Sequence, residues 1–136
     1  MMDPMPTPAI AAVMRFIDCI NGRDIDGLGA LMTDGHTLHV FNEQPTSGRA
    51  AMIEAWRDYF TSFPEYAIHP HEYSEANDGV AVLGHTTGSH LGLPDHVERA
   101  QTLIWFARVE HGRLRLWRLF EDTPHHRHEF GFGAAG

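Results

Sequence analysis

Hydrophobic and polar residues follow two different periods along this chain. Up to Pro64 most apolar residues recur every three or four positions, which is typical of amphipathic helices. After Pro64 they recur at every second position, which is typical of strands with one buried face. Helices followed by a run of strands predict an α+β fold.

Three helices are predicted in the N-terminal half, over residues 9–20, 23–32 and 49–63. Pro8 suits the first turn of the first helix, and Pro64 ends the third. Strands are predicted over five stretches: 34–41, 66–76, 79–92, 99–112 and 113–122. We expect a strongly curved antiparallel sheet that the three helices wrap into a cone-shaped barrel, because this arrangement buries both sets of apolar stripes and leaves a central pocket.

The chain reads as one domain over residues 9–123. Residues 1–8 carry three prolines and are expected to form an extended arm. Residues 124–136 show no period and are expected to form a flexible tail.

Composition narrows the possible partners. The net charge of −8 argues against nucleic acid, because a phosphate backbone repels an acidic surface. No apolar run is long enough to cross a bilayer, so no membrane association is expected. The single Cys19 cannot form an internal disulfide, which fits the cytoplasm. The sequence indicates no cofactor.

Three stretches resemble a known family when they are taken together. They are "FIDCINGRDIDGLGALMTDGH" (16–36), "SGRAAMIEAWRDYFTSFPEY" (47–66) and "VEHGRLRLWRLFED" (109–122). In this order they are similar to the SnoaL-like branch of the nuclear transport factor 2-like superfamily, with the resemblance covering residues 10–123. The resemblance implies a cone with an apolar pocket. It also implies one of several activities, among them ketosteroid isomerase, polyketide cyclase and epoxide hydrolase, or a carrier without catalysis.

Two positions bear on that choice. The catalytic aspartate of the ketosteroid isomerase-like proteins falls at Val40 in the register that the resemblance gives. The aspartate that the epoxide hydrolases carry after the Trp-Arg pair falls at Leu119, and their other two polar positions fall at His85 and Thr87. A valine and a leucine cannot move protons, so neither familiar carboxylate mechanism fits this chain.

Strand alternation and the family register together select the residues expected to face the pocket. His85 is the first candidate for a general acid or base, with Glu121 as its carboxylate partner and His36 as a second candidate. The expected ligand-binding residues come from the third helix and the strands: Trp56, Tyr59, Phe63, Thr87, Gln101, Trp105 and Trp117. Structural roles remain open for all of them: a hydrogen-bonded histidine, or a tryptophan packed in the core.

Eleven histidines also raise the question of a metal. His69, His71 and Glu75 have the H-x-H-x-x-x-E spacing of cupin-type sites, but the flanking glycines of that motif are missing. We therefore expect no metal site.

Two functions from different classes stay open at this stage. The first is an enzyme that performs histidine-assisted acid–base chemistry on a small hydrophobic molecule. The second is a non-catalytic module for ligand binding or dimerisation. The resemblance implies a homodimer through the outer face of the sheet, where Phe41, Phe106 and Leu116 would supply apolar area.

Overall fold

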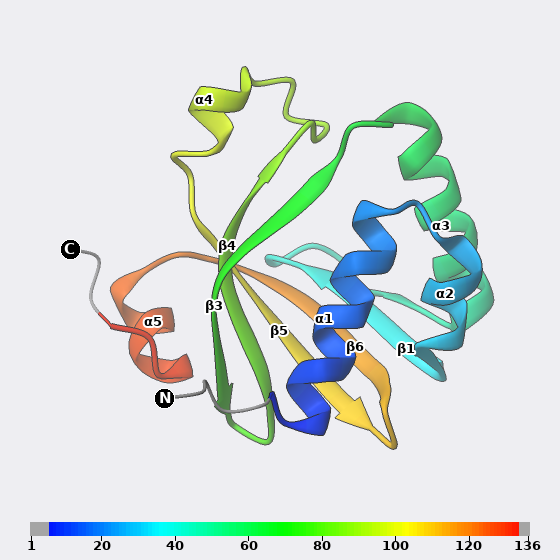
Figure 1. The fold of residues 1–136 in the computed structure, drawn as a ribbon, viewed down its shortest axis with the longest axis horizontal. Coiled ribbons are helices and arrows are strands. Elements are labelled where there is room, and N and C mark those ends of the chain that lie inside the picture. Colours follow the sequence, from blue (N-terminus) through cyan, green and yellow to red (C-terminus); the bar gives the residue numbers. More distant parts are fainter. Residues whose placement is uncertain (1–5, 134–136) are drawn as a thin grey trace.

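The three predicted helices form in the computed structural model, which describes residues 6–133 (Figure 1). They are α1 (Pro8–Asn21), α2 (Ile25–Ala30) and α3 (Arg49–Ser62). Thr7 caps α1 by accepting a hydrogen bond from the Ile10 N–H at 3.2 Å. The first five and last three residues, which belong to the predicted arm and tail, lie outside the described residues.

Six strands form one sheet in the order β2-β1-β6-β5-β4-β3. Their bounds are β1 Met32–Val40, β2 Thr46–Ser47, β3 Ala67–Ala76, β4 Gly79–Thr87, β5 Leu103–Glu110 and β6 Arg113–Glu121. The α+β class is confirmed, with two corrections to the sheet. It is mixed, because β1 pairs with β6 in parallel, and it is open, because its edge strands β2 and β3 do not pair with each other.

Helices α1, α2 and α3 cover one face of the sheet, which we call the inner face (Figure 1). The main core lies between these helices and the inner face of the sheet. Its fully buried members include Phe16, Ile17, Val82 and Trp117. Asn21 ties the end of α1 to β3, because its side chain donates to the Ile68 carbonyl and accepts from the Ile68 N–H. The end of α1 is therefore fixed against the inner face of the sheet.

The outer face of the sheet carries a fifth helix, and here the predicted tail is wrong. Residues Pro124–Phe130 form α5, and Phe130 and Phe132 are 2% and 6% exposed. Both pack on a second apolar cluster of the sheet, where the rings of Phe130 and Phe106 lie 5.1 Å apart. A helix this short is stable only when it is docked, so its sequence shows little period.

The chain between β4 and β5, residues 88–102, also differs from the prediction. Strand β4 ends at Thr87, and the residues after it form a loop with the short helix α4 (Asp95–Glu98). We call residues 88–102 the capping segment. Gly88 begins it with φ +67°, and a Cβ there would lie 2.5 Å from the Glu65 carbonyl oxygen, so the turn requires glycine.

No helix in residues 6–133 is both long enough and apolar enough to span a membrane.

Candidate functional site

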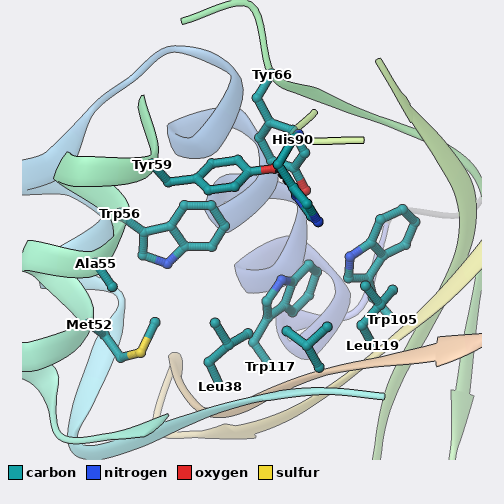
Figure 2. A pocket seen from close by; sticks show the side chains of 11 residues that line it. Leu38, Met52, Ala55, Trp56, Tyr59, Tyr66, His90, Trp105, Trp117 and Leu119 are labelled. Carbon is teal, nitrogen blue, oxygen red and sulfur yellow. Dashed lines mark hydrogen bonds between the residues drawn. The ribbon is translucent and has the colours of Figure 1, made fainter. Parts of the chain in front are cut away.

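A cavity of about 200 Å³ lies between α3 and the inner face of the sheet (Figure 2). Its walls are almost wholly apolar or aromatic, and no charged carboxylate, arginine or lysine lines it. The lining residues come from β1, α3, the turn before β3, the capping segment, β5 and β6: Leu38, Val40, Met52, Ala55, Trp56, Tyr59, Tyr66, His90, Trp105, Trp117 and Leu119. An apolar cavity of roughly 150 Å³ already holds a benzene molecule, so this one can take a small aromatic compound.

The floor of the cavity is the parallel pair β1–β6. Leu38 pairs with Trp117 and Val40 pairs with Leu119, and all four side chains line the cavity. The two positions where the family resemblance implies a carboxylate therefore do face the cavity, and both are hydrocarbon. Neither can act as an acid or a base.

Three tryptophans form the flat walls. Trp56 comes from α3, and its ring lies 5.5 Å from Phe60 on the same helix. Trp105 and Trp117 come from the adjacent strands β5 and β6, with nearly parallel rings 6.4 Å apart and an angle of 21° between them. Trp105 and Trp117 are each 2% exposed, so helix packing and strand pairing hold both rings in place.

The polar end of the cavity is formed by Tyr59 and His90. The Tyr59 hydroxyl lies 2.9 Å from His90 Nδ1, and the backbone N–H of His90 donates to the same hydroxyl oxygen at 3.2 Å. His90 is exposed, so its ring meets both solvent and the cavity. Burial raises the pKa of Tyr59, the hydrogen bond from the His90 backbone lowers it in part, and the nearby Glu98 carboxylate raises it further. Tyr59 therefore keeps its proton at neutral pH.

This pair can hold its protons in two ways. If the Tyr59 hydroxyl donates to Nδ1 of His90, the imidazole carries its proton on Nε2 and can donate it to a ligand. If Nδ1–H donates to Tyr59, then Nε2 is a free base and the tyrosine hydroxyl is available as a donor. In both arrangements the pair presents at least one donor or acceptor besides its own hydrogen bond.

Tyr66 and Glu98 lie behind this polar end. Tyr66 packs edge-on against Tyr59, with ring centroids 4.9 Å apart. Burial raises the pKa of Tyr66 far above its usual range, and the charges of Tyr59 and Glu98 add to that effect. Glu98 is 1% exposed, and one of its carboxylate oxygens accepts a hydrogen bond from the Thr86 hydroxyl while the other is enclosed without a partner. The capping segment thus carries both His90 and this buried carboxyl group.

Of the seven residues predicted to bind a ligand, four line this cavity and three do not. Trp56, Tyr59, Trp105 and Trp117 line it, as the prediction expects. Phe63 does not, but it lies beside the polar end, with its ring 4.8 Å from Tyr59 and 6.1 Å from His90.

The other two candidates do not reach the cavity. Gln101 is exposed, and it precedes β5, which begins at Leu103, so it takes no part in the strand alternation that was expected to turn it inward. Thr87 lies on the outer face of the sheet, for the same reason as His85.

The prediction that His85 faces the pocket is wrong. On β4 the inner face carries Val80 and Val82, whereas Ala81 and Leu83 belong to the outer cluster under α5. His85 continues the outer set, and its ring stacks on His69 at 4.6 Å. Both faces of β4 are covered by protein, so both alternating sets are apolar and the sequence pattern does not reveal which face is inner.

Glu121 cannot assist His85 either. It is exposed at the end of β6 and pairs with Leu103, which packs on the inner core. The two side chains therefore lie on opposite faces of the sheet. The backbone carbonyl of Glu121 accepts a hydrogen bond from His126 Nδ1 at 2.7 Å, which helps to dock α5.

His36 faces inward but is enclosed in the core. It is fully buried and packs on Phe16, and its Nδ1 donates to the Leu114 carbonyl at 2.7 Å. Burial lowers the pKa of His36, and the bond to Leu114 opposes that effect only in part. Its Nε2 has no partner. This is the environment of a neutral structural histidine, and His36 does not line the cavity.

The remaining histidines of β3 form no metal site. His71 Nε2 lies 2.7 Å from His85 Nδ1, and His69 Nε2 lies 2.9 Å from the Thr87 hydroxyl. Within residues 6–133, no three His, Cys, Asp or Glu side chains have a geometry that could hold a metal ion.

The residue that the sequence did not single out is His90. The sequence pattern predicts one strand over residues 79–92, and a strand would give His90 no special position. The one available signal is the turn-forming Gly88-Ser89 pair before it, since such residues favour the end of a strand.

The comparisons with known proteins agree with this architecture. A model of the SnoaL-like domain matches residues 13–117. None of the curated proteins matches the chain in sequence. Among solved structures, a protein from Jannaschia sp. CCS1 assigned as a SnoaL-like polyketide cyclase is 20% identical, with a TM-score of 0.69, covering 98% of this chain and 100% of that one.

Two further structures share the fold. An LEH-like epoxide hydrolase from M. tuberculosis is 17% identical, with a TM-score of 0.66 and coverage of 94% of this chain and 90% of that one. TerC, co-crystallised with polyporic acid, is 17% identical, with a TM-score of 0.68 and coverage of 92% and 99%. These identities establish the fold alone. Because the family model spans most of the chain, the protein belongs to the SnoaL-like domain family.

Proposed function

We propose that the protein binds a small, flat, hydrophobic molecule in the cone cavity and moves a proton on it with the Tyr59–His90 pair. The observation that carries the proposal is the 2.9 Å contact between the Tyr59 hydroxyl and His90 Nδ1 at one end of an otherwise apolar cavity. A single polar end in an apolar cavity fixes the orientation of a ligand.

The capping segment supports a role for His90 in acid–base chemistry. An imidazole can accept and donate a proton, and the Tyr59 hydroxyl orients this one through its hydrogen bond with Nδ1, while the His90 backbone N–H donates a second hydrogen bond to the same hydroxyl. Solved relatives of the same fold include a polyketide cyclase and an epoxide hydrolase by assignment, and TerC was crystallised with polyporic acid. His90, and not His85, is therefore the proposed general acid or base.

Deuterium exchange tests the chemistry. 2-Tetralone is a small aromatic ketone whose acidic C–H bonds exchange with D₂O, and proton NMR follows the loss of those signals. We expect the wild-type protein to accelerate the exchange and His90→Ala to reduce that acceleration about 100-fold, the usual contribution of one general base. His85→Ala is the matched control and should retain the wild-type rate. Acceleration that survives His90→Ala would contradict the assignment.

The second candidate function is a carrier without turnover. It is favoured by the hydrocarbon side chains at Val40 and Leu119, which remove the familiar catalytic carboxylates. Saturable binding of 2-tetralone, detected by chemical-shift changes in the protein, without faster exchange would support this function and exclude the first for that ligand.

A homodimer and a cytoplasmic location remain predictions. Phe106 is buried under Phe130, and Leu116 packs at the same cluster. A dimer would therefore have to form through the part of the outer face that α5 does not cover. Light scattering at micromolar concentration distinguishes a monomer from a dimer. The location rests on the single free Cys19.

A further inference from the structure

The capping segment is held in place by polar contacts more than by apolar ones. In the part of the chain that the structure describes, neither apolar cluster includes a member from residues 88–102. Between residues 90 and 101, Glu98 is the one buried residue, at 1% exposed. Glutamate is almost never fully buried without a partner, so the contacts of this carboxyl group decide how firmly the segment is held.

Hydrogen bonds join the capping segment to the rest of residues 6–133 at three points. Near its start, His90 Nδ1 lies 2.9 Å from the Tyr59 hydroxyl, and the His90 N–H donates to the same oxygen. At its end, the Thr102 hydroxyl donates to an aspartate that follows β6. In between, the Thr86 hydroxyl donates to one carboxylate oxygen of Glu98. The Thr86–Glu98 bond thus ties the middle of the segment to the sheet.

This single hydrogen bond gives the attachment little net stability. The second carboxylate oxygen of Glu98 is enclosed without a partner. A buried acceptor without a partner costs about as much free energy as one hydrogen bond contributes. Segments with few buried apolar contacts open at a small free energy, well below that of global unfolding. The middle of the capping segment therefore has the properties of a segment that opens while the sheet stays folded.

Opening would change the cavity at one place. His90 is the one cavity-lining residue that the capping segment supplies. Gly88 and Gly92 flank it with φ angles of +67° and +68°, which glycine adopts freely, so the backbone can turn on either side of His90. Figure 1 shows α4 set apart from α1, α2 and α3. Movement of the segment would thus withdraw His90 from Tyr59 and leave the rest of the cavity wall in place.

We propose that the capping segment is a lid at the polar end of the cavity and that the Thr86–Glu98 hydrogen bond is its latch. Thr86 and Glu98 are then positioning residues, because neither lines the cavity and both hold His90 against Tyr59. The effect of the lid on chemistry rests on the proposed function, in which His90 moves the proton. The opening itself is a property of the free protein and needs no ligand.

Amide hydrogen exchange of the ligand-free protein, followed by NMR, measures the opening. Two amides report on it: the His90 N–H donates to Tyr59 at 3.2 Å, and the Arg99 N–H donates to the Asp95 carbonyl at 2.9 Å. The second bond closes the four-residue helix α4, which forms only while it is docked. We expect both amides to exchange faster than those of β5 and with little dependence on urea, because lid opening exposes little surface.

Substitutions at Thr86 test the latch. Thr86→Val keeps the shape of the side chain and removes the hydrogen-bond donor. It should accelerate exchange of the two reporter amides about tenfold, the factor that one hydrogen bond represents, again with little dependence on urea. Thr86→Ser is the matched control, because it keeps the hydroxyl, and it should exchange as the wild type does. Thr86→Val combined with Glu98→Leu leaves no unpaired polar group, so slow exchange should return.

The outcomes separate the lid from the proposed function. If the reporter amides show the same urea dependence as the β5 amides, the segment opens only with the whole protein and the lid is overturned. A Thr86→Val protein that does not fold has the same meaning, since loss of the latch should cost no more than lid opening. If Thr86→Val leaves exchange of the reporter amides unchanged, the latch is overturned. If the lid opens as expected but His90→Ala still accelerates the exchange of 2-tetralone, the proposed function fails and the lid stands.

Discussion

Val40 and Leu119 are direct register partners across the parallel β1–β6 pair, and both side chains line the cavity. Two positions that lie far apart in sequence thus form one hydrocarbon patch on the cavity floor. The polar chemistry of this protein lies at the opposite side, where α3 meets the capping segment. A hydrocarbon floor and a polar far end together define the environment that a ligand would meet.

Restoring a carboxylate at Val40 should destabilise the protein at neutral pH. In Val40→Asp, burial raises the pKa of the new carboxyl group above its unfolded value of ~3.9, so ionisation opposes folding. We expect a loss of about 2–4 kcal/mol in the free energy of unfolding at pH 7, measured by urea denaturation. The loss should shrink as the pH falls towards 4, because the buried group is then neutral. Val40→Asn is the control and should show a penalty that does not depend on pH.

His36 should make stability depend on pH in the opposite direction. Its folded pKa lies below the unfolded value of about 6.5, so the unfolded state binds the proton more readily. The stability that His36 contributes is fully present above pH 6.5 and is lost as the pH falls from there through its folded pKa, by up to ~1.4 kcal/mol per pH unit. His36→Asn keeps a donor for the Leu114 carbonyl and cannot titrate. The difference between the two unfolding curves should therefore vary between pH 7 and pH 5, and a constant difference would contradict this account.

Asp122 and Arg127 should hold α5 on the sheet. Arg127 Nε and a terminal guanidinium nitrogen donate to the two Asp122 oxygens at 2.6 and 2.7 Å, and Thr102 donates to the same carboxylate. The hydrogen bond from Arg127 holds the pKa of Asp122 below its usual range. We expect Asp122→Asn to cost about 1–3 kcal/mol at pH 7. Because the folded pKa is depressed, the difference from wild type should disappear as the pH falls below ~4.

A surface ion pair gives the control for that experiment. Glu54 and Arg57 form an ion pair on α3 with side chains 63% and 53% exposed. Glu54→Gln should change stability by less than ~0.5 kcal/mol. If Glu54→Gln and Asp122→Asn lower the free energy of unfolding equally, burial does not increase the stabilisation that the Asp122–Arg127 pair provides.

Phe130 should be the main apolar anchor of α5. Its ring contacts Phe106 and Phe120, each with centroids 5.1 Å apart. Phe130→Ala should cost about 3–5 kcal/mol and raise hydrogen exchange in the described part of the C-terminal segment, up to residue 133. It should also expose Phe106 and promote self-association, which light scattering detects. Leu91→Ala, at a side chain that is 52% exposed, should leave both stability and association unchanged.

The helices and the inward-facing residues of β1 and β6 could be predicted, because their apolar residues recur at the spacing of a single inward-facing side. Apolar residues at helical spacing place α1 and α3 correctly, and strand alternation places Leu38 and Val40 on the same face of β1. The family register correctly turns Trp117 and Leu119 inward as well. Each of these patterns is set by the residues of one helix or strand that face the core, so the spacing along the sequence is enough to identify them.

The remaining features depend on contacts between distant segments. His90 meets Tyr59 across 31 positions of sequence, and neither strand nor helix periodicity encodes that contact. β4 is apolar on both faces because α5 covers its outer side, so alternation could not show that His85 faces away from the cavity. The sequence by itself determined the α+β class, the inner face of β1 and β6, and the absence of a carboxylate at Val40 and Leu119. Only the tertiary structure decided which histidine reaches the cavity, because the position of the capping segment is fixed by long-range packing and not by local period.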